Sequence, residues 1–333
     1  MIKFGYQKNI IDLPEERKHH VKPLVRLGGI ALAVGISLPI FILGITLNSY
    51  GFFHDGEITK NLLVIISAFS MFLLGISDDV YNLSPKLRLF IQFLIIFIIW
   101  NFGFKYEHLT LITNMDLSMQ LSKILSCFFI MIWIVGVTNS INWIDGLDGL
   151  AIGNVIAASI TICVINLLSA NYFSFLVSLS LLSSSLAFLR FNKYPAKIYM
   201  GDGGSYFLGS LLAFLVLLSS NANSNFDVNN LNVIIFIPFF ILFIPIVDMV
   251  VVIFQRLMDG NSPFYPDRSH LHHKLLRMGY SHKNTVKIIY LFSFLSSSIS
   301  FLFLDFKRLF LLTFLICLFV IFRVSKIKQI NMF

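Results

Sequence analysis

The sequence predicts an all-α fold, a polytopic bundle of about ten transmembrane helices, and three observations point to it. Hydrophobic residues make up 57% of the 333 residues and charged residues only 13%, whereas soluble domains are typically about half apolar and a quarter charged. The mean hydropathy is +0.82. The apolar residues form long runs between short polar segments, with no strand-like alternation or repeat period. Inside lipid the backbone N–H and C=O groups must be hydrogen-bonded within the protein, and a helix bundle satisfies all of them.

The apolar runs approach the roughly 20 helical residues that cross a bilayer core about 30 Å thick. The expected spans are 27–50, 61–77, 87–104, 122–138, 149–169, 172–190, 204–220, 232–255, 285–303 and 308–323. They form one catalytic transmembrane domain over 27–323, between a basic N-terminal segment at 1–26 and a basic tail at 324–333. The expected cytoplasmic loops are 78–87, 139–148, 191–203 and 256–284.

The distribution of Lys and Arg predicts the orientation, because these residues gather on the cytoplasmic side of membrane proteins. With the N-terminus placed in the cytoplasm, the outer segments hold five of the 25 Lys and Arg: Lys60, Lys105, Lys123, Lys307 and Arg308. The inner segments hold the others. The first 26 residues are polar and basic and lack the apolar core of a secretory signal.

The cysteines suggest no disulfide or zinc site. Cys127, Cys163 and Cys317 each lie inside an apolar run, without paired spacing. They are expected to be small buried hydrophobic residues.

The first candidate site is a pair of adjacent carboxylates, Asp78 and Asp79, at the inner end of the second span. Two such groups repel each other and resist entering lipid unless a cation or a metal-bound phosphate lies nearby. One of them could act as a base toward a phosphate-bearing lipid. The alternative is a solvated pair with Lys86 and Arg88 as counter-ions.

The second candidate site is a series of polar residues at intervals of three: Asn139, Asn142, Asp145 and Asp148. In a helix, residues three apart share a face. Their oxygens suit a hard cation such as Mg²⁺, and they also suit hydrogen bonds to a nucleotide base. The alternative is a capped loop between two helices.

The third candidate site is a glycine-rich segment before the seventh span, where Gly201, Gly203 and Gly204 surround Asp202. Backbone N–H groups of such a loop can face an anion at a helix N-terminus. Asp202 suits that setting if it holds a divalent ion that bridges to a phosphate. The segment is not a Walker A sequence, because the Gly-Lys-Ser/Thr ending is absent.

The fourth candidate site is the histidine cluster of the longest inner loop, His270, His272 and His273. With nearby Arg256, Arg268 and Lys274, these side chains could clamp a diphosphate. A zinc site and a plain basic loop are the alternatives, although no HExxH pattern or neighbouring cysteine supports zinc.

Three further ionisable residues, His19, His20 and Asp248, lie outside the four candidate sites. His19 and His20 are expected to be solvated in a basic segment. Asp248 lies about 12 Å along its helix from Arg256, a depth that is costly unless the carboxylate faces the bundle interior. It could support the site or pair with a buried polar group, and we assign it no chemistry.

Five segments in chain order together resemble the polyprenyl-phosphate N-acetylhexosamine-1-phosphate transferases of glycosyltransferase family 4, over essentially the whole chain. They are Asp12-Leu-Pro-Glu-Glu-Arg-Lys-His19 through Gly28-Gly29, Asp78-Asp79-x-x-Asn82, Asn139-x-x-Asn142-x-x-Asp145-Gly-x-Asp148-Gly-Leu, Gly201-Asp202-Gly-Gly-Ser205, and Asp267-Arg-x-His270-Leu-His-His273. There are two departures from the family pattern. The family's usual span before the first segment lacks a counterpart here, so the protein either lacks it or begins upstream of Met1, and Val25 stands where a Pro is common.

The resemblance implies an enzyme that transfers an N-acetylhexosamine-1-phosphate from a UDP-sugar to undecaprenyl phosphate and releases UMP. The Ser262-Pro263-Phe264 and His270-Leu271-His272-His273 segments resemble the branch that uses UDP-GlcNAc or a related sugar for O-antigen, enterobacterial common antigen or teichoic-acid synthesis. The phospho-MurNAc-pentapeptide transferases of peptidoglycan synthesis are the alternative. A transporter is an alternative of another class, but transporters place ionisable groups near mid-membrane.

The resemblance also implies roles for the candidate residues. Those expected to act in catalysis are Asp78, Asp79, Asp145, Asp148, His270, His272 and His273. Those expected to bind substrate are Asn139, Asn142, Gly201, Arg268 and Lys86. Asp202 and Asn142 would hold Mg²⁺, with Mn²⁺ as an alternative. The expected location is the bacterial cytoplasmic membrane with an active site on its inner face; a homodimer is allowed, and no nucleic-acid partner is expected.

Overall fold

The computed structural model describes residues 11–12, 24–49, 55–104, 119–220, 231–265, 267–304 and 306–317. The regular secondary structure of this part of the chain is helical, except for one antiparallel pair of two-residue strands, β1 (Ile11–Asp12) and β2 (Leu24–Val25). The all-α prediction is therefore confirmed. Most of the N-terminal segment 1–26, including His19 and His20, and the tail 324–333 lie outside the described residues.

The helices follow the expected spans closely. They are α2 (Gly28–Ser49), α3 (Asp55–Tyr81), α4 (Pro85–Asn101), α6 (Met119–Trp143), α7 (Leu150–Leu168), α8 (Tyr172–Asn192), α9 (Gly201–Ser220), α10 (Leu231–Ile241), α11 (Phe243–Met258), α12 (Leu271–Arg277) and α13 (His282–Phe303). A further helix covers 307–317, and the rest of the last expected span lies outside the described residues.

Six helices of the described residues are long and apolar enough to cross a membrane: α3, α6, α7, α8, α9 and α13. The protein is therefore a multi-pass membrane protein, although a total of about ten spans is not confirmed. The span expected at 232–255 is not one continuous helix, because α10 ends at Ile241 and α11 begins at Phe243. Pro245 explains the break: it has no N–H to donate to the carbonyl of Ile241, and its ring would clash with that carbonyl.

Local signals set several helix starts. Ser84 caps α4, where its Oγ accepts from the N–H of Leu87 at 3.4 Å, and Pro85 follows at the first helical position. Asn171 caps α8 in the same way through the N–H of Ser174, at 3.2 Å. Each cap satisfies a backbone donor that the first helical turn leaves unpaired.

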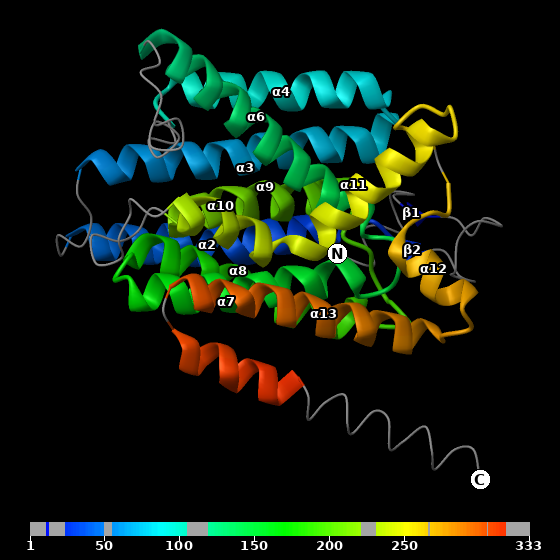
Figure 1. Cartoon of the computed structure of the whole chain (residues 1–333). Helices are drawn as coiled ribbons and strands as arrows, with labels where there is room; N and C mark the ends of the chain where they lie inside the picture. The colour runs from blue at the N-terminus through cyan, green and yellow to red at the C-terminus, as the bar shows by residue number, and fades with distance from the viewer. Residues whose placement is uncertain are drawn as a thin grey trace.

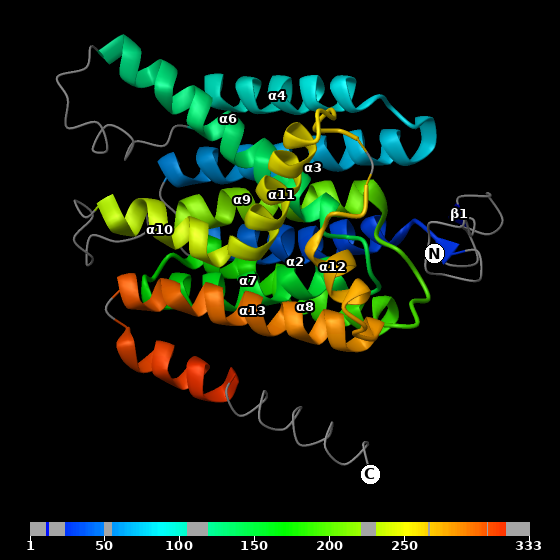
Figure 2. The ribbon, with the colours of Figure 1, turned by 45° about the vertical axis from the view of Figure 1, so that its right-hand side comes forward.

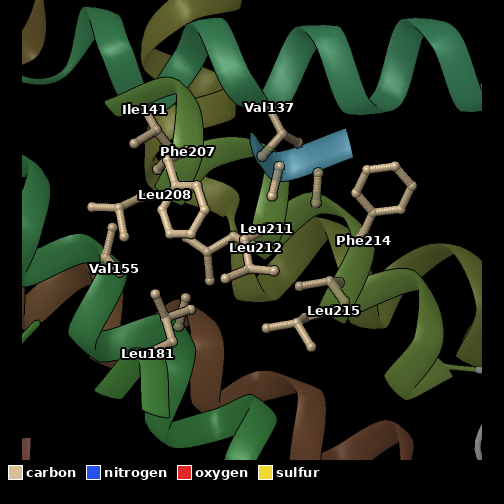
Figure 3. Packing of buried hydrophobic residues seen from close by; sticks show 14 of the residues in the cluster. Val137, Ile141, Val155, Leu181, Phe207, Leu208, Leu211, Leu212, Phe214 and Leu215 are labelled. Atoms are coloured by element: carbon tan, nitrogen blue, oxygen red, sulfur yellow. The ribbon is translucent and has the colours of Figure 1, made fainter. Parts of the chain in front are cut away.

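Helix α9 lies at the centre of the bundle (Figures 1 and 2). Figure 3 shows its side chains packed against residues of α6, α7 and α8. The labelled residues are Val137 and Ile141 of α6, Val155 of α7, Leu181 of α8, and Phe207, Leu208, Leu211, Leu212, Phe214 and Leu215 of α9. They are almost fully buried, so α9 is a fixed support for the residues at its N-terminus.

The chain places the predicted polar segments at one end of the bundle. The β1–β2 pair and α12 lie at this end, on the right of Figure 1. The start of α2 joins the segment before α9 through main-chain hydrogen bonds, in which Gly28 N–H donates to the carbonyl of Tyr199 at 2.9 Å and Gly29 N–H donates to the carbonyl of Met200 at 2.8 Å. The starts of α2 and α9 therefore lie side by side.

Helices α3 and α9 also approach each other closely at this end. A Cβ on Gly75 of α3 would overlap the carbonyl oxygen of Asp202 and lie 2.6 Å from Cα of Gly203. Because these neighbours are main-chain atoms, they cannot move aside as a flexible side chain would.

We expect Gly75→Ala to lower the free energy of unfolding by about 1–3 kcal/mol, as overpacking does in other cores. Gly136→Ala is the matched control, because the nearest atom to its Cβ would be Met249 Cε at 4.0 Å. The control should be neutral or stabilising by up to about 1 kcal/mol. Thermal unfolding of both variants in detergent measures the difference, and equal melting temperatures would contradict the close approach.

Candidate active site

The core of the site is a hydrogen-bonded group that joins α6 to α9. Asn142 lies near the end of α6, and its Nδ2 donates to Asp202 Oδ1 and to Ser205 Oγ, each at 2.9 Å. Asp202 lies in the first turn of α9, where the helix dipole favours a negative charge. Its side chain is 32% exposed, so one side of the carboxylate stays open. The structure thus brings together two residues predicted for metal binding.

Asp79 adds a second carboxylate, from the last turn of α3. Its Oδ2 accepts from Gly203 N–H at 3.1 Å, and Arg26 Nη1 lies 3.8 Å from its Oδ1. Gly201 adopts a positive φ of 70°, and a Cβ there would lie 2.6 Å from Asp79 Oδ2. A glycine is therefore needed at this position, both for its backbone conformation and for the carboxylate beside it.

Asp78, the neighbour of Asp79, is already occupied by protein groups. Its Oδ1 accepts from Leu83 N–H at 2.9 Å, and its Oδ2 accepts from Arg88 Nη1. The same Arg88 nitrogen lies 3.7 Å from Asp202 Oδ2. Arg88 thus links two carboxylates that would otherwise repel each other.

The sequence interpretation chose Lys86 as the substrate-binding cation of α4 and named Arg88 only as a counter-ion. In the structure Lys86 is exposed, and Arg88 is the α4 cation in contact with Asp78 and Asp202. One signal could have identified it. Between Lys86 and Asn101, Arg88 and Gln92 are the only polar residues of α4. They are four residues apart, and such a pair shares one face of a helix.

Asn139 lies on α6 but contacts a different partner from Asn142. Its Nδ2 donates to Gln92 Oε1 at 2.7 Å and to the carbonyl of Val135 at 2.8 Å. It therefore faces α4. Asn139 and Asn142 both lie on α6, as the spacing of three predicts. Because α6 ends at Trp143, Asp145 lies in the following turn and does not share their helix.

Asp145 and Asp148 have separate environments in the turn between α6 and α7. Burial among protein groups raises the pKa of Asp145 to about 7, and the nearby carboxylates of Asp148 and Asp79 add to the shift while Arg26 opposes it. Asp148 accepts from Ala196 N–H at 2.9 Å and from Tyr199 Oη at 3.2 Å. Asp148 therefore holds the segment before α9 in place.

The histidine segment packs against this turn. A Cβ on Gly146 would overlap the ring of His272, so only glycine leaves room for the imidazole. The rings of His270 and His272 are stacked with centroids 5.6 Å apart, and His272 and His273 are 4.3 Å apart. All three histidines thus lie next to the Asp145 turn, whereas the Arg268 side chain is exposed.

An ion pair between the buried Arg256 and the partly exposed Asp267 anchors the histidine segment to α11. Arg256 donates from Nε and Nη2 to the two carboxylate oxygens of Asp267, each at 3.0 Å, and its guanidinium lies 5.0 Å from the Trp143 ring centroid. Burial opposes ionisation of Asp267, but hydrogen bonds from Arg256 and Ser269 outweigh it and hold its pKa well below the usual range.

The oxygen groups of the site fit a magnesium ion that is held partly by substrate, and not a metal ion enclosed by protein ligands alone. Within the described residues, no group of three or more His, Cys, Asp and Glu could hold a metal ion. Mg²⁺ does not require one, because it keeps several waters and binds through one or two carboxylates together with substrate phosphates. The partly exposed carboxylate of Asp202, with Asn142 and Asp79 beside it, offers oxygen ligands of this kind.

The sequence is similar to that of known glycosyl transferases. A model of glycosyl transferase family 4 matches residues 61–220. A probable undecaprenyl-phosphate N-acetylglucosaminyl 1-phosphate transferase of Bacillus subtilis (strain 168) is 35% identical over 315 residues, covering 94% of this chain and 82% of the relative.

More distant relatives have related names. A decaprenyl-phosphate N-acetylglucosaminephosphotransferase of Mycobacterium leprae is 30% identical over 292 residues, 84% of this chain and 73% of the relative. An undecaprenyl-phosphate alpha-N-acetylglucosaminyl 1-phosphate transferase of Escherichia coli (strain K12) is 26% identical over 304 residues, 89% of this chain and 77% of the relative.

Proposed function

The chain belongs to glycosyl transferase family 4, and on that premise we propose that it transfers N-acetylglucosamine-1-phosphate from UDP-GlcNAc to undecaprenyl phosphate. The products are UMP and a lipid-linked sugar diphosphate. The observation that carries this proposal is the meeting of Asp79, Asn142, Asp202 and the histidine segment at one end of a membrane bundle. A diphosphate needs groups of this kind, and the bilayer holds the acceptor lipid at the same depth.

The chemistry is an in-line displacement at the β-phosphorus of the UDP-sugar. An oxygen of the acceptor phosphate forms the new P–O bond, and the bond from the β-phosphorus to the bridging oxygen of UMP breaks. Charge grows on the leaving group, so positioning and electrostatic stabilisation supply most of the catalysis. Mg²⁺, when bound, would neutralise charge on the diphosphate.

Asp202 would hold the ion, with Asn142 beside it. Between the two carboxylates proposed to face the acceptor, Asp79 is the better choice. Both oxygens of Asp78 are engaged by Leu83 and Arg88, whereas Asp79 Oδ1 accepts no hydrogen bond from the described residues. Asp79 would orient the acceptor phosphate or accept its proton.

The remaining residues would act on the donor. Asp145 would face the nucleoside, and the histidines with Arg268 would bind the diphosphate. Asp148 would contribute by holding the 196–199 segment at the start of α9. The charge asymmetry of Lys and Arg supports a cytoplasmic N-terminus and a site on the cytoplasmic face of the inner membrane. The polymer built from the product, and a homodimer, stay predictions.

The test is the transfer reaction with purified protein and undecaprenyl phosphate. The donors are UDP-GlcNAc, UDP-GalNAc, UDP-QuiNAc, UDP-FucNAc and UDP-MurNAc-pentapeptide, and the readouts are UMP release and the mass of the lipid product. We expect UMP release with UDP-GlcNAc and a product mass of undecaprenyl diphosphate plus GlcNAc. A product from the pentapeptide donor alone would favour the peptidoglycan branch. Sugar flux across vesicles without UMP release would favour a transporter.

A further inference from the structure

Asp248 is a buried carboxylate of α11 that the proposed chemistry leaves without a role. Its Oδ2 lies 2.8 Å from His270 Nδ1, and its Oδ1 accepts from Leu271 N–H at 2.7 Å. Both oxygens are therefore used by consecutive residues of the histidine segment. Asp248 is 22 positions away in sequence, and no sequence motif indicated this pairing.

The hydrogen bond fixes which nitrogen of His270 carries a proton. An ionised carboxylate can only accept, so Nδ1 must donate to Asp248, and Nε2 is the nitrogen left for another partner. The same bond restricts rotation of the imidazole. The Trp143 ring lies edge-on to His270, with the centroids 6.1 Å apart, and the His272 ring is stacked on the His270 ring. The ring is thus held between α11, the end of α6 and its own segment.

Helix α11 holds the histidine segment at a second point as well. Arg256 lies two turns after Asp248 and pairs with Asp267, just before the histidines. Both Asp248 and Arg256 are buried, which places them on the inward face of α11. A buried charge gains little net stability from its partner, because desolvation offsets the attraction. The contacts of Asp248 and Arg256 with the histidine segment are therefore better explained by the orientation that they give to this segment than by stability.

We propose that Asp248 is a positioning residue that holds His270 with Nδ1–H toward the carboxylate, so that Nε2 faces the substrate diphosphate and donates to it when the imidazole is protonated. This inference rests on the proposed function for the identity of the substrate. The contact between Asp248 and His270 itself does not depend on it.

The kinetic test is a double-mutant cycle of Asp248→Asn with His270→Asn. An asparagine can keep the Leu271 bond through Oδ1, but its amide donates toward Nδ1 and favours the opposite tautomer of His270. We expect Asp248→Asn to lower kcat for UMP release by about 10–100-fold, the usual effect of losing a carboxylate that orients a functional histidine. Asp248→Glu should recover part of the loss, because it restores an acceptor.

The cycle separates positioning from a general structural effect. In the His270→Asn background, adding Asp248→Asn should change kcat less than twofold, since there is no imidazole left to orient. An equal loss in both backgrounds would overturn the proposal. Asp259→Asn is the matched control, because it makes the same chemical change at the exposed end of α11 and should leave kcat unchanged.

A spectroscopic readout tests the contact without reference to activity. The ¹⁵N spectrum of histidine-labelled protein should show a protonated Nδ1 and an unprotonated Nε2 for neutral His270, with the signals identified by their loss in His270→Asn. Asp248→Asn should reverse that pattern. An unchanged tautomer would overturn the inference. Absence of UMP release from the wild-type protein, with the tautomer as expected, would instead contradict the proposed function.

Discussion

Replacing Asp202 by alanine is expected to abolish UMP release, lowering kcat by about 10³-fold or more, while the protein stays folded. The reason is that Asp202 is the partly open carboxylate of the site, bonded to Asn142 and 3.7 Å from Arg88. A group that stabilises charge in the transition state is worth about 10²–10³ in rate by itself, and loss of the metal would add to that. The measurement is UMP release in detergent with undecaprenyl phosphate.

A second variant of Asp202 shows whether the lost activity depends on its negative charge. Asp202→Asn keeps the shape of the side chain and an oxygen that can accept from Asn142 Nδ2 but removes the charge, and it should be as inactive as the alanine variant. Thermal unfolding should show little destabilisation for either, because removing this charge relieves repulsion with nearby carboxylates. Normal turnover by Asp202→Ala would refute the metal-binding role.

Removal of divalent ions has the second largest expected effect. EDTA should stop UMP release completely, and Mg²⁺ or Mn²⁺ should restore it, because an uncompensated diphosphate would face Asp79 and Asp202. A zinc-selective chelator should have no effect, which separates this reading from the zinc alternative for the histidine cluster. Activity that is indifferent to EDTA would remove the metal from the mechanism.

A binding measurement checks the same claim without catalysis. In the presence of UDP-GlcNAc and without acceptor, Mg²⁺ should raise the melting temperature of the wild-type protein, since a ligand of the folded state stabilises it. The Asp202→Ala protein should show a much smaller rise. Equal shifts in both proteins would place the ion elsewhere.

The sequence predicted the helical spans because hydropathy follows the bilayer directly, but it misplaced their ends. Asp78 and Asp79 were assigned to a loop and lie in the last turn of α3, and Asp202 was assigned to a loop and lies in the first turn of α9. Helical hydrogen bonding continues beyond the last apolar residue, so an apolar run underestimates the helix. The histidine loop similarly contains α12.

The composition of the site was largely predictable, because helices that alternate across a membrane bring every second loop to one side. The direction of each side chain was not, since it depends on contacts between helices. Asn139 faces Gln92 and not Asp202, and Asp148 holds Ala196. Asp248 was recognised as requiring an inward position, but its partner in the histidine segment could be found only in three dimensions.

The glycine contacts between α2, α3 and α9 have a consequence for how the reaction geometry is maintained. Gly29 lies against Gly204, and Gly75 lies against Asp202 and Gly203. The helices therefore meet through main-chain atoms, and no rotamer change can alter their spacing. The spacing of the two backbone segments that carry Asp79 and Asp202 is thus set by main-chain contacts. Substitutions on the outward faces of these helices should therefore leave that spacing unchanged.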